Sequence, residues 1–371
     1  MTGTRCRRSG GRYRLPPWRK CRLFRAGYRG DKVKSTLSRL PVILPAVSAV
    51  IAASSGGPTQ YVPFVKSVYA GAAYLIRKVF SANFLSILSR FYGSISDESV
   101  LAMIAAHFEV VRVLNHCGAR ALTKHFPNYP NKYVTGYLAK SLGKKSRRDT
   151  LKFHHRYLAE HLGGSFYEQI LRRRPVFWSE TIEGDCYAVS LSFNPRWHAE
   201  GDISITFDKN EIPLYELAFS IVPGALFGCS TGAAIFIGRV QGRKGQAEEI
   251  KDAMRTCHRI KTPHLLMIAV QSIADALSIT TVCGVRTEEQ LAKTPQDDDF
   301  FFDYDTFWET FQDNKKRSNV YEISVPFGEK PLEQLKTKYR NRARLKRRLK
   351  NEIGASIGAA FATSFVTKQP R

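Results

Sequence analysis

Four short β-rich segments in the middle of the chain constrain the fold more than any other feature of the sequence. Residues 186–193 alternate apolar and polar side chains, residues 203–207 are short and β-rich, and residues 214–222 and 233–240 are longer apolar runs. Gly and Pro residues separate these segments, as the turns between consecutive strands require. The sequence therefore predicts an antiparallel meander of four strands.

Helical patterns lie on both sides of this meander. Residues 97–116 repeat apolar side chains at helical spacing, and residues 149–162 carry a second helix, within a region that is helical from about 63 to 174. After the meander the sequence predicts, in order, helices at 247–259 and 263–278, a strand at 280–285, a short helix at 304–312, a strand at 320–325 and a basic amphipathic helix at 332–352. The helix at 263–278 is apolar nearly all round, so we expect it to be buried.

This order of elements predicts a mixed α/β fold of the α+β type. N-terminal helices come first, and a largely antiparallel sheet with a helix-pair crossover follows. Strands and helices do not alternate from the start, which excludes a doubly wound sheet. The same order is compatible with an acetyltransferase-like (GNAT-like) fold.

We expect four parts along the chain: residues 1–62, a helical subdomain at 63–174, a mixed α/β core at 175–352 that ends in the basic helix, and a tail at 353–371. Residues 1–62 join a long basic stretch to an uncharged apolar run that prolines interrupt. This first part has three competing interpretations. It is a basic, poorly structured arm, it results from a start assigned too far upstream, or it is a membrane or export segment.

Most of the positive charge of the chain lies in two blocks. Residues 1–39 carry a net +12 and residues 330–350 a net +9, so together they supply +21 of the total of +25. Blocks of like charge act on polyanions through long-range, salt-sensitive attraction. The seven cysteines are scattered without a C-x-x-C pair, which fits free thiols in a reducing compartment. We therefore expect a cytoplasmic protein.

Five ordered segments between residues 85 and 352 resemble the bacterial VirK/YbjX family. They are A-A-I-F-I-G-R-V-Q-G at 233–242, H-H-R-Y-L at 154–158, H-R-I-K-T-P-H-L-L at 258–266, D-Y-D-T-F-W at 303–308 and the Arg-rich stretch at 339–348. The chain departs from the family at 311–313, where relatives tend to have glycines. The family is catalogued as a domain of unknown function, and its members are associated with virulence, outer-membrane protein display and resistance to cationic antimicrobial peptides. The resemblance therefore implies an envelope-related role and supplies no reaction.

A glycine turn between the last strand of the meander and the next helix is a candidate cofactor site. It contains Gly242, Arg243, Lys244 and Gly245. Amides at a helix N-terminus, two glycines and two cations fit a phosphate or pyrophosphate, and the acetyltransferase superfamily binds coenzyme A at this location. Against this, the superfamily's Arg or Gln three places before a glycine is absent, and Glu248 and Glu249 would oppose an anion. Coenzyme A binding and an ordinary strand-to-helix connection both remain open.

Two pairs of residues are candidates for proton transfer. His154 and His155 flank the buried stripe of their helix, and a half-buried imidazole near neutral pKa would serve as a general base. Asp303 and Asp305 end an acidic stretch whose oxygens suit Mg²⁺ or Ca²⁺, but the stretch lacks the Gly and the terminal Glu of a calcium loop. Each pair also has a structural interpretation, the histidines as core side chains bonded to backbone and an aspartate as a helix cap. We predict no metal site.

The basic helix is the candidate surface for lipid or polyanion binding. Its predicted contact residues are Arg340, Arg342, Arg344, Lys346, Arg347 and Arg348. A basic amphipathic helix is typical of a membrane-surface element or of a nucleic-acid contact, and it would also fit the acidic stretch at 297–305 of the same chain. The sequence has no aromatic stacking ladder and no zinc or helix-turn-helix signature. Anionic lipid or self-docking is therefore favoured over nucleic acid.

Three functions follow from these features. The first is a cytoplasmic envelope or stress factor, peripheral on the inner membrane, with acyltransferase-like chemistry and coenzyme A as cofactor. The second is a non-catalytic adaptor that binds an envelope protein or anionic lipid with the same fold. The third is a nucleic-acid-binding protein that uses the basic blocks. An open pocket that joins the glycine turn to the histidines or aspartates favours the enzyme, whereas a closed core favours the adaptor.

Overall fold

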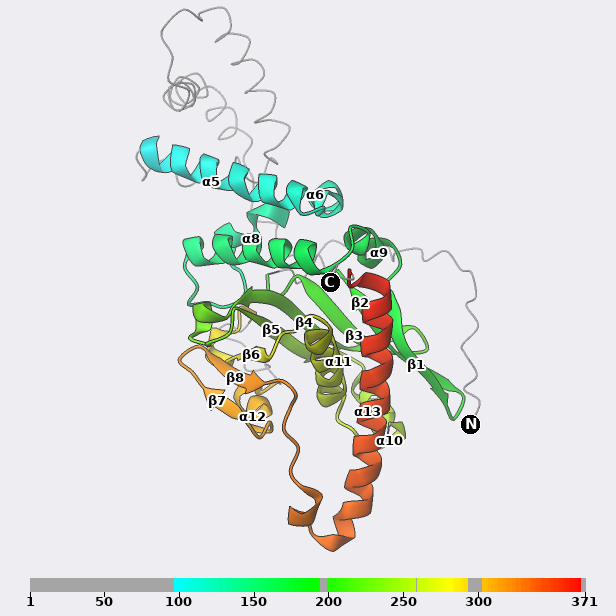
Figure 1. The fold of residues 1–371 in the computed structure, drawn as a ribbon. Helices are drawn as coiled ribbons and strands as arrows, with labels where there is room; N and C mark the ends of the chain where they lie inside the picture. Colours follow the sequence, from blue (N-terminus) through cyan, green and yellow to red (C-terminus); the bar gives the residue numbers. More distant parts are fainter. Residues whose placement is uncertain (1–96, 128, 194–198, 258, 293–301, 368–371) are drawn as a thin grey trace, which may run out of the picture. The chain divides into compact units, whose positions relative to one another are not determined.

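The computed structural model describes residues 97–127, 129–193, 199–257, 259–292 and 302–367 (Figure 1). The arm at 1–62 and residues 297–301 of the acidic stretch lie outside these ranges. The chain divides into two compact units, whose described parts are residues 97–111 and residues 112–367. The sheet and all the candidate site residues belong to the second unit, and so do the helices that follow residue 112.

One eight-stranded sheet forms the centre of this second unit, in the order β1-β2-β3-β4-β5-β6-β8-β7 (Figure 1). The strands are β1 (Val176–Ile182), β2 (Asp185–Ser192), β3 (Ile203–Lys209), β4 (Ile212–Pro223), β5 (Ala233–Gly242), β6 (Thr281–Val285), β7 (Asn314–Lys316) and β8 (Val320–Ser324). Strands β1 to β5 are consecutive antiparallel neighbours, β5 pairs in parallel with β6, and β8 pairs antiparallel with both β6 and β7. The predicted mixed α/β fold with a largely antiparallel sheet is confirmed.

The helices agree with the predicted order. They are α5 (Asp97–His116), α6 (Arg120–His125), α7 (Lys132–Thr135), α8 (Lys144–His161), α9 (Phe166–Arg172), α10 (Ala247–Thr256), α11 (Thr262–Ala276), α12 (Tyr304–Glu309) and α13 (Thr337–Phe365). Parallel neighbours cannot be joined by a hairpin, so α10 and α11 provide the predicted crossover between β5 and β6. Among the described helices, none is both long enough and apolar enough to span a bilayer.

The prediction for the C-terminal helix was wrong in its bounds. A short 3-10 turn occupies Leu332–Gln334, and α13 begins at Thr337 and continues to Phe365, so most of the expected tail is helical. Its last part is held by a buried stripe at four-residue spacing, formed by Ile353, Ile357, Phe361 and Phe365. Phe361 and Phe365 each pack edge-on against Phe177 of β1, with ring centroids 5.9 Å apart. This apolar stripe fixes the helix on the sheet.

Helices α11 and α13 lie side by side and approach each other closely at Gly354 (Figure 1). The hydroxyl of Ser272 in α11 donates a hydrogen bond of 2.9 Å to the carbonyl oxygen of Gly354. A Cβ atom at Gly354 would lie 3.2 Å from Ile268 Cγ2 and 3.2 Å from Ser272 Oγ, whereas one at Gly358 would meet Ser272 Cβ at an ordinary 3.7 Å. The packing therefore requires a small residue at 354 more strictly than at 358.

We expect Gly354→Leu to lower the free energy of unfolding by about 1–3 kcal/mol, because the added side chain must enter a filled helix interface. The variant Gly358→Ala should raise it by up to about 1 kcal/mol, because alanine has the higher helix propensity and its Cβ would make only ordinary contacts with Ser272. Urea unfolding followed by circular dichroism measures both. Equal stability of the two variants would contradict this account of the α11–α13 contact.

Candidate functional site

His154, on α8, supplies a hydrogen-bond acceptor at the end of a strand pair. Strand β3 begins at Ile203, opposite Phe219, while β4 continues beyond this point, so the amide of Ile221 has no partner in β3. That amide donates to Nδ1 of His154 at 3.0 Å. The neutral ring must then carry its proton on Nε2, which lies 3.8 Å from Oδ2 of Asp202 and makes no hydrogen bond within the described residues. The structural interpretation of a core histidine bonded to backbone applies to His154.

His155 lies between two tyrosine hydroxyls. Its Nε2 is 2.9 Å from the hydroxyl of Tyr129, and its Nδ1 is 2.5 Å from that of Tyr167. Burial lowers the pKa of both His154 and His155 well below the ordinary value, and Lys132 lowers both further. Both rings are therefore neutral in the folded protein.

Asp202 is the centre of this arrangement. Its carboxylate accepts hydrogen bonds from Tyr129, Lys132 and Tyr137, and from the hydroxyl of Ser220 at 2.6 Å. The ammonium group of Lys132 also lies over the rings of Tyr129 and Tyr137, at 4.6 and 4.1 Å from their centroids. We refer to these side chains together as the buried polar cluster: Tyr129, Lys132, Tyr137, His154, His155, Tyr167, Asp202 and Ser220.

The buried polar cluster is enclosed by protein. The exposed fraction of His155 is 0% and that of His154 and of Asp202 is 1%. Burial alone lowers the pKa of Lys132, and the contact with Asp202 provides its counterion. Removing one partner of such a buried pair typically costs about 3–5 kcal/mol, because the other charge is left without a partner. Through Asp202, which directly precedes β3, and Ser220, the cluster links α7, α8 and α9 to β3 and β4.

The sequence did not reveal most of this cluster. Lys132 and Asp202 are 70 residues apart along the chain, and no local pattern marks either of them. The segment around Tyr129 was predicted only as a turn that separates helices, although its tyrosine and the following lysine stand close to the aromatic Tyr137. A buried helix that carries two adjacent histidines was the one available signal that polar partners must exist nearby.

The glycine turn is closed by its own hydrogen bonds. The amide of Arg243 donates to the carbonyl of Leu214 at 2.9 Å, and the amide of Gln246 donates to Arg243 at 3.1 Å. A Cβ atom at Gly242 would lie 3.0 Å from Ile250 Cδ1 and from Tyr215 Cε2, so the side of Gly242 that a ligand would need is filled by side chains. Gly245 has a φ of +85°, which only glycine adopts readily. The turn has the features of a strand-to-helix connection.

Asp303 and Asp305 organise the start of α12. Asp303 is the N-cap, and its carboxylate accepts from the amide of Thr306 at 3.1 Å and from its hydroxyl at 2.5 Å. Asp305 accepts from the amide of Thr287 at 3.3 Å and lies 3.9 Å from the guanidinium of Arg286. The proposed capping role of Asp303 is confirmed. The histidines and the aspartates thus have separate hydrogen-bond partners among the described residues.

The six cations predicted on the basic helix divide into two groups. Arg340 donates to the carbonyl of Leu335 at 3.0 Å, Lys346 donates to that of Arg259 at 2.9 Å, and Arg347 forms an ion pair of 2.6 Å with Glu329. The other three, Arg342, Arg344 and Arg348, are exposed. The first group therefore holds α13 against neighbouring loops. The second faces solvent, where Arg344 bonds to Asn341 at 3.2 Å and Arg348 pairs with Glu352 at 2.8 Å along the same helix.

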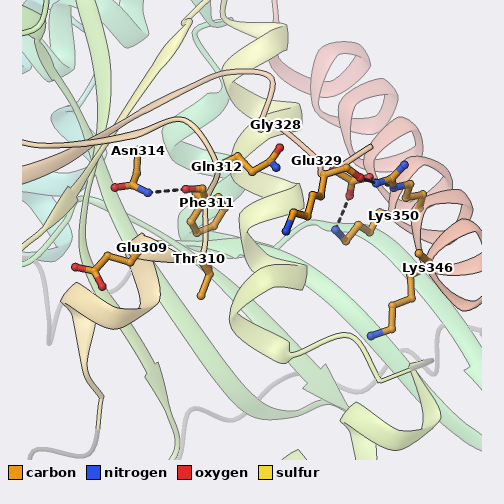
Figure 2. Close-up of a pocket in the computed structure, with 12 residues that line it drawn as sticks. Glu309, Thr310, Phe311, Gln312, Asn314, Gly328, Glu329, Lys346 and Lys350 are labelled. Carbon is orange, nitrogen blue, oxygen red and sulfur yellow. Dashed lines mark hydrogen bonds and ion pairs between the residues drawn. The ribbon is translucent and has the colours of Figure 1, made fainter. Parts of the chain in front are cut away.

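A hollow of about 560 Å³ lies on one side of the basic part of α13 (Figure 2). Phe311 and Gln312 line it on one side and Lys346 and Lys350 on the other. Glu329 occupies its rim and pairs with both Arg347 and Lys350 at 2.6 Å. Two of its cations are thus already neutralised.

A second hollow, of about 360 Å³, is lined by Arg255, Arg259, Arg342, Leu345 and Lys346, and we call it the cationic hollow. None of these lining residues is acidic. Besides burial, the neighbouring charges of Arg342, Lys350 and Arg259 lower the pKa of Lys346. Like charges are therefore held close together here, as they are in sites that bind anions.

Comparison with known proteins places these observations in a family. A family model described as "Protein of unknown function (DUF535)" matches residues 100–358. The "Uncharacterized protein YbjX" of Escherichia coli (strain K12) is 24% identical over 227 residues, which cover 59% of this chain and 67% of that protein. No solved structure matches the chain. The resemblance to the VirK/YbjX family is confirmed.

Acidification from pH 7 to pH 5 should destabilise the protein in part through His154. Its pKa lies well below 6.5 in the folded state and near 6.5 in the unfolded chain, so below about pH 6.5 the unfolded state binds a proton that the folded state excludes. Stability from this group is complete above about pH 6.5 and is lost as the pH falls, and the unfolded pKa limits the loss at pH 5 to at most about 2 kcal/mol.

The variant His154→Gln keeps an acceptor for the amide of Ile221 and removes the titrating ring. Urea unfolding at pH 7 and pH 5 should show that this variant loses less free energy of unfolding than the wild-type protein over the same interval, by up to about 2 kcal/mol. An identical loss in both proteins would show that the ring does not resist protonation in the folded state.

Proposed function

The chain belongs to the VirK/YbjX family of proteins of unknown function (DUF535), and because membership supplies no activity, we propose a function from the surface of α13. We propose that the protein is a peripheral membrane-binding factor that attaches to anionic lipid through the exposed face of the first half of α13. The proposal corresponds to the non-catalytic interpretation of the sequence. An envelope-related role, which the family resemblance implies, is consistent with it.

The observation that carries the proposal is the mixture of charge and apolar surface on one short stretch of helix. Arg342, Arg344 and Arg348 are exposed there. Leu345, which lies between Arg342 and Arg348, is 62% exposed, and Tyr339, three residues before Arg342, is 50% exposed. Cations attract anionic headgroups, while exposed aromatic and aliphatic side chains enter the boundary between headgroups and acyl chains. A nucleic-acid contact would need the cations but would leave Leu345 without a partner.

The magnitudes predict a weak and reversible attachment. Each Arg near an anionic surface contributes roughly 1 kcal/mol, so three contribute about 3 kcal/mol at moderate ionic strength. Burying Leu345 adds roughly 1.5–3 kcal/mol when the side chain leaves water completely. The sum of about 5 kcal/mol corresponds to a dissociation constant of a few tenths of a millimolar, expressed as the concentration of accessible lipid. Binding of this strength requires an anionic membrane and is lost at high salt.

An acyltransferase-like function receives less support from the geometry. Such an enzyme needs backbone amides open to coenzyme A and a general base that substrate can reach. The amide of Arg243 is bonded to Leu214 of β4 and that of Gln246 to Arg243, and His154 and His155 are enclosed. By the criterion of an open pocket, the described residues favour binding over catalysis.

The double variant Arg344→Gln/Arg348→Gln should weaken sedimentation with phosphatidylglycerol-containing vesicles about thirty-fold, since two charges of about 1 kcal/mol each are removed. The matched control is Arg172→Gln/Arg173→Gln, which removes two exposed arginines at the end of α9. Arg172 is paired with Glu168 four residues away, as Arg348 is paired with Glu352.

The control variant should bind as the wild-type protein does. If both double variants lose binding equally, net charge rather than the surface of α13 is responsible. If neither loses binding, the proposed membrane contact is wrong.

A further inference from the structure

We propose that the cationic hollow is a binding site for the phosphate monoester headgroup of an anionic lipid such as phosphatidate. This inference rests on the proposed membrane function and names the lipid class that the same surface selects. The hollow opens beside the exposed stretch of α13 and shares Leu345 with it. The lipid-binding face and the hollow are therefore continuous.

The hollow is built from different parts of the chain. Arg255 comes from the last turn of α10, Arg259 from the connection to α11, and Arg342 and Lys346 from one face of α13, four residues apart. Its volume of about 360 Å³ is at the lower end of the range for small-molecule sites. A headgroup phosphate with part of its glycerol fits in this space.

The hollow differs from its neighbour in its charge balance. In the larger hollow, Glu329 already pairs with Arg347 and Lys350. In the cationic hollow, the lining contains no acidic side chain, and the ion pair of Arg255 with Asp252 is long at 3.3 Å and exposed. Lys346 donates to the carbonyl of Arg259, which satisfies one N–H but does not neutralise its charge. A bound anion would relieve the repulsion among these cations.

The arrangement fits a phosphate monoester better than a phosphodiester. A monoester carries about −1.5 to −2 charges at neutral pH and three terminal oxygens, whereas a diester such as phosphatidylglycerol carries a single charge and two terminal oxygens. Arginine guanidinium groups bind phosphate oxygens in pairs, so Arg255, Arg259 and Arg342 can each engage a different edge of a monoester. Nearby cations also favour the dianionic form.

Leu345 identifies a lipid rather than a soluble phosphate as the source of the headgroup. This side chain lines the hollow and is 62% exposed, so it has little protein to cover it. A soluble phosphate ester would leave the leucine in water, whereas a lipid headgroup brings its acyl region to it. The cations of the hollow would thus contact the headgroup phosphate, and Leu345 would contact the acyl region of the same lipid molecule.

Arg259 offers a substitution that removes a charge without disturbing the backbone. The φ of Arg259 is +57°, in the left-handed region. Its backbone carbonyl accepts a hydrogen bond from Lys346, and a substitution of the side chain keeps this carbonyl. Glycine adopts this conformation more readily than arginine. Arg259→Gly should therefore fold with an unchanged or higher melting temperature.

The test uses the full chain and phosphatidylcholine vesicles that contain either phosphatidate or phosphatidylglycerol, adjusted to the same zeta potential. The wild-type protein should sediment about ten-fold more strongly with phosphatidate, a preference of the size that one charge-assisted phosphate contact provides. The variant Arg259→Gly/Arg342→Gln should bind both kinds of vesicle equally. The variant Arg344→Gln/Arg348→Gln should bind both more weakly and keep the preference.

Equal binding of wild-type protein to both vesicles would overturn the phosphomonoester site and leave the membrane function standing. A preference that persists in Arg259→Gly/Arg342→Gln would overturn the assignment to the cationic hollow. Absence of binding to either vesicle would overturn the membrane function and this inference with it. Calorimetry with glycerol 3-phosphate distinguishes the sources, since binding of this soluble ester as tight as that of phosphatidate would overturn the assignment to lipid.

Discussion

The close packing of α11 against the second half of α13 is the contact on which the functional surface depends. Gly354 lets the two helices approach, and the stripe from Ile353 to Phe365 anchors α13 to the sheet. Because the second half of α13 is packed against α11 and the sheet, the first half continues from it in a fixed direction, with its arginines exposed. Backbone carbonyls and Glu329 then orient the cations that do not face solvent.

The buried polar cluster has a different role from the surface of α13. Asp202 joins a lysine, two tyrosines and a serine into one network that connects the helices before the sheet with β4. Hydrogen-bonded networks of buried side chains rigidify the surrounding elements, so the contacts of Asp202 help to specify one arrangement of them. The two histidines lie beside this network, and burial, with a smaller contribution from the charge of Lys132, keeps them neutral.

Local patterns in the sequence predicted the fold well, and tertiary contacts explain what they missed. Helix α11 and strands β2 to β5 follow from periodicity and turn residues, which are properties of neighbours in the chain. Strand β1 was missed although its β-rich residues lie between Pro175 and Gly184, which are ordinary turn signals. The hydroxyl of Tyr129 that contacts His155 and the carbonyl that Lys346 contacts lie far away in the sequence, so no spacing rule could show that the histidines are enclosed or which cation is already bonded.

The central claim is that the exposed stretch of α13 touches an anionic membrane, and tryptophan fluorescence tests it most directly. The variant Leu345→Trp places the probe on this stretch, and Ile212→Trp places it on β4 at a site that is also exposed, at 55%. With anionic vesicles that contain brominated lipids, the account predicts a blue shift and quenching of the emission of Leu345→Trp, beyond that of the wild-type protein, and no added change for Ile212→Trp. Equal behaviour of the two probes would contradict it.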